Sequence, residues 1–176
     1  MSKNVVALLP GSDAPDETVA FSAHWDHLGI DPNIEGDNIY NGAADNATGT
    51  AALLALARVL SQETHRRSYL FIALTAEESG LLGSAWFADN PTVPLATMAG
   101  LINMDAMNPI GATRDVIVVG YGSSELEALL EQSATEQQRV LVPETTPEKG
   151  FFYRSDHFNF AKRGVPVLYA KAGVDH

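Results

Sequence analysis

The sequence predicts one α/β domain, with helices on both faces of a mixed, mainly parallel central sheet. Short apolar runs alternate along the chain with segments whose apolar residues recur at helical spacing, which is typical of a three-layer α/β/α architecture. With 176 residues, 45% of them hydrophobic, the chain is long enough to bury one sizeable core. No repeat or low-complexity linker divides residues 1–176, so we interpret them as a single domain.

The first predicted strands, at residues 4–11 and 18–26, are apolar runs separated by a turn-rich segment. Because the segment between them is short, we expect them to form an antiparallel pair. A long helix is predicted over residues 44–63, with Asn46 or Thr48 near its cap. Its expected packing face is formed by Leu53, Leu56, Val59 and Leu60.

Residues 68–75 form an apolar run with almost no polar interruption, which is typical of a strand covered on both faces. A helix at residues 78–90 and a strand at residues 99–104 are predicted to follow. The last part of the chain continues the alternation of strands and helices. The elements predicted there are a strand at residues 115–121, helices at 123–137 and around 155–164, and a strand at 165–170.

Acidic residues outnumber basic ones, with 22 Asp and Glu against 11 Lys and Arg, for a formal charge of −11. This balance argues against binding to nucleic acid or to an anionic membrane, because both require basic patches. The absence of cysteine excludes disulfides, thiolate metal sites and cysteine nucleophiles. No apolar run is long enough to predict a membrane-spanning helix.

Acidic and imidazole side chains recur where the predicted strands end. They are His24 and Asp26 after the second strand, Glu77 and Glu78 after the third, and Asp105 after the fourth. Asp45 lies in a glycine-bearing loop before a helix. In an open α/β sheet the carboxyl ends of the strands form the crevice in which ligands bind. Carboxylates and imidazole gathered there indicate a divalent metal site.

The segment AHWDHLG, residues 23–29, places His24 and Asp26 on the same side of an extended chain. Asp26 could therefore orient the ring of a metal-binding His24 through a hydrogen bond. The alternative is a surface pair at the end of a strand. His27 is a weaker candidate ligand, for which packing or a supporting contact is the favoured role.

Asp45 stands in NGAADNATG, residues 41–49, where capping the following helix is the simplest role. The small residues around it would instead let an ion approach closely. In TAEESG, adjacent Glu77 and Glu78 repel each other unless a positive charge lies between them. Beside a metal, one could bind the ion while the other removes a proton from water; two solvated acids are the alternative. Asp105 follows an apolar strand, where a charge is costly unless it is paired or metal-bound.

Five motifs occur in order along the chain: AHWDHLG, DNIYNGAADNATGTAALLALARVL, TAEESGLLGS, LINMDAM and YRSDHFNFAKRGVPVL. Together they resemble the co-catalytic zinc peptidase family that contains the secreted bacterial leucine-type aminopeptidases and glutamate carboxypeptidase II. The resemblance covers almost the whole chain. It implies a zinc-peptidase, phosphorylase/hydrolase-like fold and a zinc-dependent exopeptidase that acts on a peptide substrate, with aminopeptidase action favoured. It also implies secretion or a periplasmic location.

The resemblance implies a role for each motif residue. His24 and Asp105 would bind one zinc ion, and Glu78 would bind a second. Asp45 would bridge the two ions and would be followed by a cis peptide bond. Glu77 would be the general base that takes a proton from metal-bound water, which yields the attacking hydroxide.

The end of the chain departs from the family pattern. Arg154, in RSDH, matches a position that in some relatives contacts the tetrahedral intermediate, where its charge would stabilise negative charge. The family's remaining ligand is a histidine downstream of the last core strand, and this chain stops at AKAGVDH, so the resemblance implies a truncated catalytic domain. His157 or His176 could substitute. Apolar surface beside residues 165–170 would then be exposed and would favour homo-oligomers.

Two functions other than exopeptidase activity stay open at this point. Relatives of the same fold that have lost their metals serve as binding or scaffold ectodomains, and glutaminyl-cyclase-like enzymes use a single zinc. The polar residues of the crevice favour an enzyme, because a binding module has no physical need for so many costly polar groups in one place. Carboxypeptidase action is also open.

Overall fold

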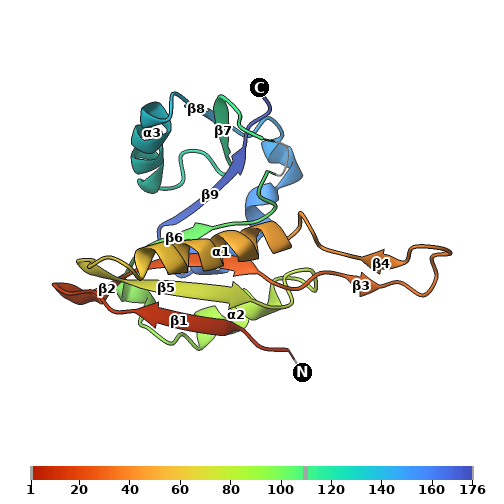
Figure 1. The fold of residues 1–176 in the computed structure, drawn as a ribbon, viewed down its shortest axis with the longest axis horizontal. Helices are drawn as coiled ribbons and strands as arrows, with labels where there is room; N and C mark the ends of the chain where they lie inside the picture. The colour runs from red at the N-terminus through yellow and green to blue at the C-terminus, as the bar shows by residue number, and fades with distance from the viewer. Residues whose placement is uncertain (1, 109–110, 176) are drawn as a thin grey trace.

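The structure is a computed structural model and describes residues 2–108 and 111–175. A seven-stranded mixed sheet forms its centre (Figure 1). From one edge to the other the strand order is β1-β5-β2-β6-β9-β7-β8. The strands are β1 (Val5–Leu9), β2 (Ala14–His24), β5 (Arg67–Leu74), β6 (Met98–Asn103), β7 (Asp115–Val118), β8 (Val140–Pro143) and β9 (Val167–Ala172). The predicted mixed, mainly parallel sheet is therefore confirmed.

The four central strands β5, β2, β6 and β9 run parallel, whereas β1 and β7 run antiparallel to β5 and β9. The expected antiparallel pairing of the first two strands is wrong, because β5 lies between them. The apolar β5 is largely buried and needs a neighbour on each side. β1 supplies that neighbour, with Val5 opposite Ala73 and Leu9 opposite Tyr69. The short separation of β1 and β2 along the sequence thus did not make them neighbours in the sheet.

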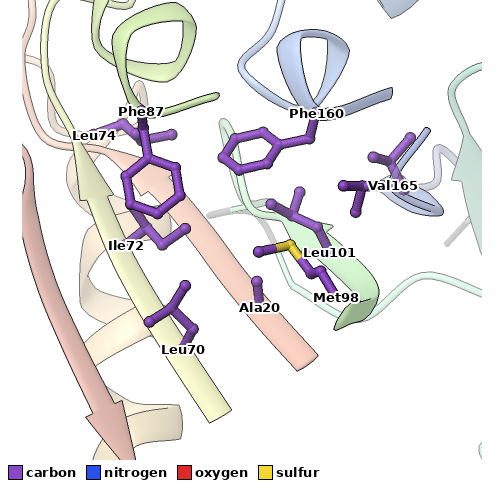
Figure 2. Close-up of a cluster of buried hydrophobic side chains, with 10 residues drawn as sticks. Ala20, Leu70, Ile72, Leu74, Phe87, Met98, Leu101, Phe160 and Val165 are labelled. Carbon is purple, nitrogen blue, oxygen red and sulfur yellow. The ribbon is translucent and has the colours of Figure 1, made fainter. Parts of the chain in front are cut away.

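Helices cover both faces of the sheet, which confirms the three-layer architecture. On one face, Leu53 of α1 (Ala47–Leu60) packs with Phe21 of β2 and Phe71 of β5. On the other, Phe87 of α2 (Leu82–Asp89) and Phe160 of α4 (His157–Ala161) pack over the sheet, as Figure 2 shows. Burying each such aromatic side chain stabilises the fold by about 1.5–3 kcal/mol.

The predicted helices are present but shorter than expected. α1 begins only at Ala47, because the side chain of Asn46 accepts a hydrogen bond from Gly49 N at 3.0 Å and caps it. Within α1, Leu53 is buried, but Val59 is 59% exposed, so its placement on the packing face is wrong. The helix predicted at 123–137 is α3 (Leu126–Glu136).

Several short elements carry no clear sequence signal. The strands β3 (Gly29–Ile30) and β4 (Ile39–Tyr40) pair as a hairpin that extends away from the sheet (Figure 1). β8 was also not predicted. The short 3-10 helices are η1 (Leu95–Thr97), η2 (Pro147–Lys149) and η3 (Phe151–Tyr153). Within the described ranges, no helix is both long and apolar enough to cross a membrane.

Candidate metal centre

The parallel strands β2, β5 and β6 end on the same side of the sheet (Figure 1), and we call the region at their carboxyl ends, where the predicted ligands gather, the crevice. His24 is the last residue of β2, and its Nε2 atom lies 3.0 Å from Oδ1 of Asp45 and 3.4 Å from Oδ1 of Asp105. We call these three residues the first ligand group. The structure brings them together as the sequence predicted, and their binding of metal stays a prediction.

A second ligand group adjoins the first. It contains Glu78, Asp45 and, in addition, His27, whose Nδ1 atom lies 2.6 Å from Oε1 of Glu78. In each group the potential ligand atoms all lie within 4.8 Å of one another. Asp45 belongs to both groups, which is the bridging position that the family resemblance implied.

The donor atoms of the two groups fit a divalent metal. Nε2 of His24, Oδ1 of Asp45, Oε1 of Glu78 and Nδ1 of His27 are buried and have no hydrogen-bond partner among the described residues. Tetrahedral zinc with bonds of 2.0–2.1 Å holds its ligand atoms roughly 3.3 Å apart, close to the 3.0 and 3.4 Å found around His24. Buried nitrogen and carboxylate oxygen atoms without protein partners are the donor set that zinc binds.

The ring of His24 is oriented for a ligand at Nε2. Its Nδ1 donates to the backbone carbonyl of Asp26 at 3.1 Å, which leaves the Nε2 lone pair directed at Asp45 and Asp105. The predicted hydrogen bond between the His24 ring and the Asp26 carboxylate is wrong, because Oδ1 of Asp26 lies 3.8 Å from Nδ1 of His24. β2 ends at His24, so strict alternation of side chains does not extend to Asp26. The Asp26 carboxylate instead accepts the N–H of Glu77 at 3.1 Å.

A series of buried hydrogen bonds, which the sequence did not predict, holds the Asp105 carboxylate in place. Ser155 Oγ donates to Oδ2 of Asp105 at 2.6 Å and accepts from Nδ2 of Asn103 at 2.8 Å. Oδ1 of Asn103 in turn accepts from Ser22 at 2.7 Å, within the sheet. The signal was the polar residues Ser22 and Asn103 in otherwise apolar strands, which are costly unless they are paired.

Asn46 ties the Asp45 loop to the Asp105 loop. Its side chain donates to the carbonyl of Met104 at 3.0 Å and accepts from the N–H of Ala106 at 3.1 Å, besides capping α1. The peptide bond between Asp45 and Asn46 is cis, as the resemblance implied. The side chain predicted as a simple cap therefore also positions two carboxylates of the first group.

The ionisation of the site follows from its burial and crowding. Burial raises the pKa of Glu77 to about 8, and Glu77 belongs to neither ligand group. Although burial opposes it, contact with Asp105 raises the pKa of His24 to about 9. Metal binding must therefore displace a proton from His24, while Glu77 can hold a proton near neutral pH.

Three predicted residues lie apart from the two groups. The exposed Arg154 guanidinium lies over the ring of Phe151, 5.4 Å from its centroid, so its contact with a reaction intermediate stays a prediction. His157 is fully buried between the rings of Phe152 and Tyr169, each 4.9 Å away, and is in neither ligand group. His176 lies outside the described residues.

Comparisons with known proteins identify the family of the chain. The family model described as "Peptidase family M28" matches residues 4–175. A "Probable zinc metalloprotease" of Pyrenophora tritici-repentis is 34% identical over 146 residues, which cover 79% of this chain and 29% of the relative. Another, of Pyricularia oryzae, is 34% identical over 112 residues, 63% of this chain and 22% of the relative. The chain thus spans less than a third of the length of these two relatives.

Solved structures share the fold. The aminopeptidase of Aneurinibacillus sp. strain AM-1 superimposes with a TM-score of 0.76 at 23% identity, over 98% of this chain and 40% of its own. A glutaminyl cyclase of Bacteroides thetaiotaomicron gives a TM-score of 0.71 at 20% identity, over 94% and 62%. Given the family match along nearly its whole length, the chain belongs to peptidase family M28.

Proposed function

We propose that this chain is the catalytic domain of a zinc-dependent exopeptidase that removes residues from the amino end of peptides. The observation that carries the proposal is the pair of ligand groups that share Asp45, with the carboxyl group of Glu77 beside them. Two ions sharing one carboxylate suit hydrolysis of a peptide bond. A single-zinc cyclase and a metal-free scaffold would each leave at least one group of buried donors without a purpose.

In this mechanism Glu77 moves the proton. Zinc bound at the two groups would supply Lewis acidity toward the scissile carbonyl and toward water. The Glu77 carboxylate would accept a proton from the attacking water and then deliver it to the leaving amine. Burial raises the pKa of Glu77 to about 8 in the metal-free site, and the positive charge of bound zinc would lower it from there. The opposing effects suit both steps near neutral pH, because a base and its conjugate acid must both be accessible.

The charge of the crevice favours a free amino terminus as the bound end of the substrate. Bound zinc favours the ionised form of Glu77, and with Glu77 ionised the carboxylates of the crevice carry more negative charge than two zinc ions would neutralise. These carboxylates are Asp26, Asp45, Glu77, Glu78 and Asp105. The remaining negative charge attracts the α-ammonium group of a peptide and repels an α-carboxylate. This asymmetry supports aminopeptidase rather than carboxypeptidase action.

The test compares substrates that differ at one end only. The zinc-loaded chain should hydrolyse leucine p-nitroanilide and should leave N-acetyl-leucine p-nitroanilide intact. Preference for a peptide with a blocked amino end and a free carboxylate would show a carboxypeptidase instead. Conversion of a glutaminyl peptide to its pyroglutamyl form without hydrolysis would favour the cyclase. Loss of activity in Glu77→Gln ties the measured reaction to the crevice.

A further inference from the structure

We propose that His27 is a metal ligand in this chain and that it completes the second site with Glu78 and Asp45. The inference rests on the proposed function for the presence of metal at the first group. It adds a ligand that the sequence pattern alone did not favour. His27 stands in the segment after β2, close to the end of the strand that carries His24.

The surroundings of Nδ1 of His27 favour a ligand atom over a packed ring, and binding zinc together with Glu78 would require the two atoms to move apart to roughly 3.3 Å. Its Nδ1 lies 2.6 Å from Oε1 of Glu78, yet neither atom has a hydrogen-bond partner with acceptable geometry among the described residues. Both atoms are buried, although the side chains of His27 and Glu78 are 23% and 21% exposed. The donor atoms thus lie inside the crevice, and Asp45 completes the group. Neutral imidazole binds zinc through Nδ1 as well as through Nε2.

The surroundings of His27 hold its ring in this position. On one side, the edge of the ring contacts Tyr40 of β4, with 6.1 Å between ring centroids. On the other, Gly42 has a φ of +65°, and a Cβ there would lie 2.9 Å from Cβ of His27. Only glycine permits this close approach without displacing His27. Tyr40 and Gly42 therefore hold the ring of His27 with its Nδ1 toward Glu78. Metal-binding histidines are oriented by neighbouring residues in this way.

The competing possibility is a simple ion pair between His27 and Glu78. Such a pair needs no metal, so replacing His27 would leave metal stoichiometry unchanged. A ligand role instead requires that one of two bound ions depend on His27. Metal binding therefore separates the two roles without any measurement of activity.

The experiment titrates the chelator-treated chain with Zn²⁺ by calorimetry and with Co²⁺ by visible absorption. The unaltered chain should bind two ions. His27→Ala should keep the first and bind the second at least about 100-fold more weakly, because loss of a supporting contact alone costs 10- to 100-fold. His24→Ala should weaken the other ion. His65→Ala is the matched control and should keep both, because His65 contacts the Leu60 carbonyl and Tyr69 away from the crevice.

A spectroscopic measurement on the unaltered chain tests the same role without any variant, so its result does not depend on whether His27→Ala folds. Titration with Cd²⁺ should shift the ¹⁵N resonance of His27 Nδ1 in the step that fills the second site. Two ions bound with unchanged affinity in a folded His27→Ala variant, or an unmoved Nδ1 resonance, would overturn the role of His27 and leave the proposed function standing. No metal bound by the unaltered chain would overturn both.

Discussion

Buried carboxylates at two places beside the sheet differ in their hydrogen-bond partners. Asp115, at the start of β7, accepts the N–H groups of Asp175 at 2.9 Å and Val174 at 3.1 Å, which we call the Asp115 clamp. Gly173 makes this possible, since a Cβ there would lie 1.7 Å from Oδ1 of Asp115. In the crevice, Oδ1 of Asp45 and Oε1 of Glu78 are also buried but have no hydrogen-bond donor among the described residues.

The difference separates a carboxylate that serves the fold from carboxylates that serve a ligand. A buried oxygen without a hydrogen-bond partner costs the fold about 1–3 kcal/mol, so a chain that concentrates such atoms in one crevice maintains them for another purpose. Removing groups from the crevice should therefore affect metal binding and catalysis and leave the fold stable. Removing the clamp should do the reverse.

The largest effect is expected at Glu77. Glu77→Gln keeps the shape of the side chain but cannot accept a proton, so kcat should fall by about 10²- to 10⁴-fold while metal content and thermal midpoint stay unchanged. Because Glu77 is in neither ligand group, Glu78→Gln is the matched comparison and should lose metal from the second site. Steady-state kinetics with metal analysis would check both variants. Equal loss of metal in the two would contradict the division of roles between these neighbours.

Most of the fold could be predicted because it depends on local patterns. The near-continuous apolar run of β5 and the helical spacing in α1 each identify their element directly. The order of strands could not be predicted, since β5 pairs with both β1 and β2 from a distant part of the sequence. The two-residue strands β3 and β4 are too short to show a period.

The candidate site was predictable where a charged side chain follows a buried strand or stands among small residues. His24, Asp45, Glu78 and Asp105 all lie in the two groups, because charges beside buried strand ends are costly without a purpose. The inclusion of His27 was not predictable, since its position depends on how the hairpin leaves the sheet. The contact from Ser155 to Asp105 joins residues 50 positions apart, and no local pattern encodes it.

Asp156 resembles the carboxylates of the crevice rather than Asp115. It is fully buried, and neither of its carboxylate oxygens has a hydrogen-bond partner among the described residues. Burial raises the pKa of Asp156 to about 7, so the folded chain loses stability as the pH rises from the unfolded value near 3.9 through 7. Asp156→Asn, neutral at every pH, should be more stable than the metal-free parent at pH 8, on the order of 2 kcal/mol, with little difference at pH 4. Urea unfolding at both pH values measures this, and a destabilised variant at pH 8 would refute it.

Ser155 tests how far the crevice depends on its supports. Ser155→Ala removes the hydrogen bond to Oδ2 of Asp105 and leaves the carboxylate free to rotate away from His24. Zinc affinity at the first group should fall by about 10- to 100-fold, with the second group little changed. Calorimetric titration measures both sites. Ser123→Ala, at an exposed position between β7 and α3, is the control and should leave both affinities unchanged.

The smallest effect is expected at the clamp, and it should appear in stability alone. The backbone N–H of Asp175 holds the pKa of Asp115 below its usual range, aided by that of Val174. A carboxylate with a lower pKa in the folded chain stabilises the fold above its unfolded pKa, near 3.9, and this contribution is lost as the pH falls through the folded value. Asp115→Asn should therefore unfold a few degrees lower than the parent at pH 7.

The pH dependence and a control distinguish the clamp from a general loss of charge. The thermal midpoints of Asp115→Asn and its parent should converge as the pH falls below about 4, because the parent carboxylate is then protonated too. Asp13→Asn, at an exposed position, should match the parent throughout. Zinc affinity should be the same in all three chains. If Asp115→Asn instead lost zinc at unchanged stability, the clamp would belong to the site, and the contrast between the clamp and the crevice would fail.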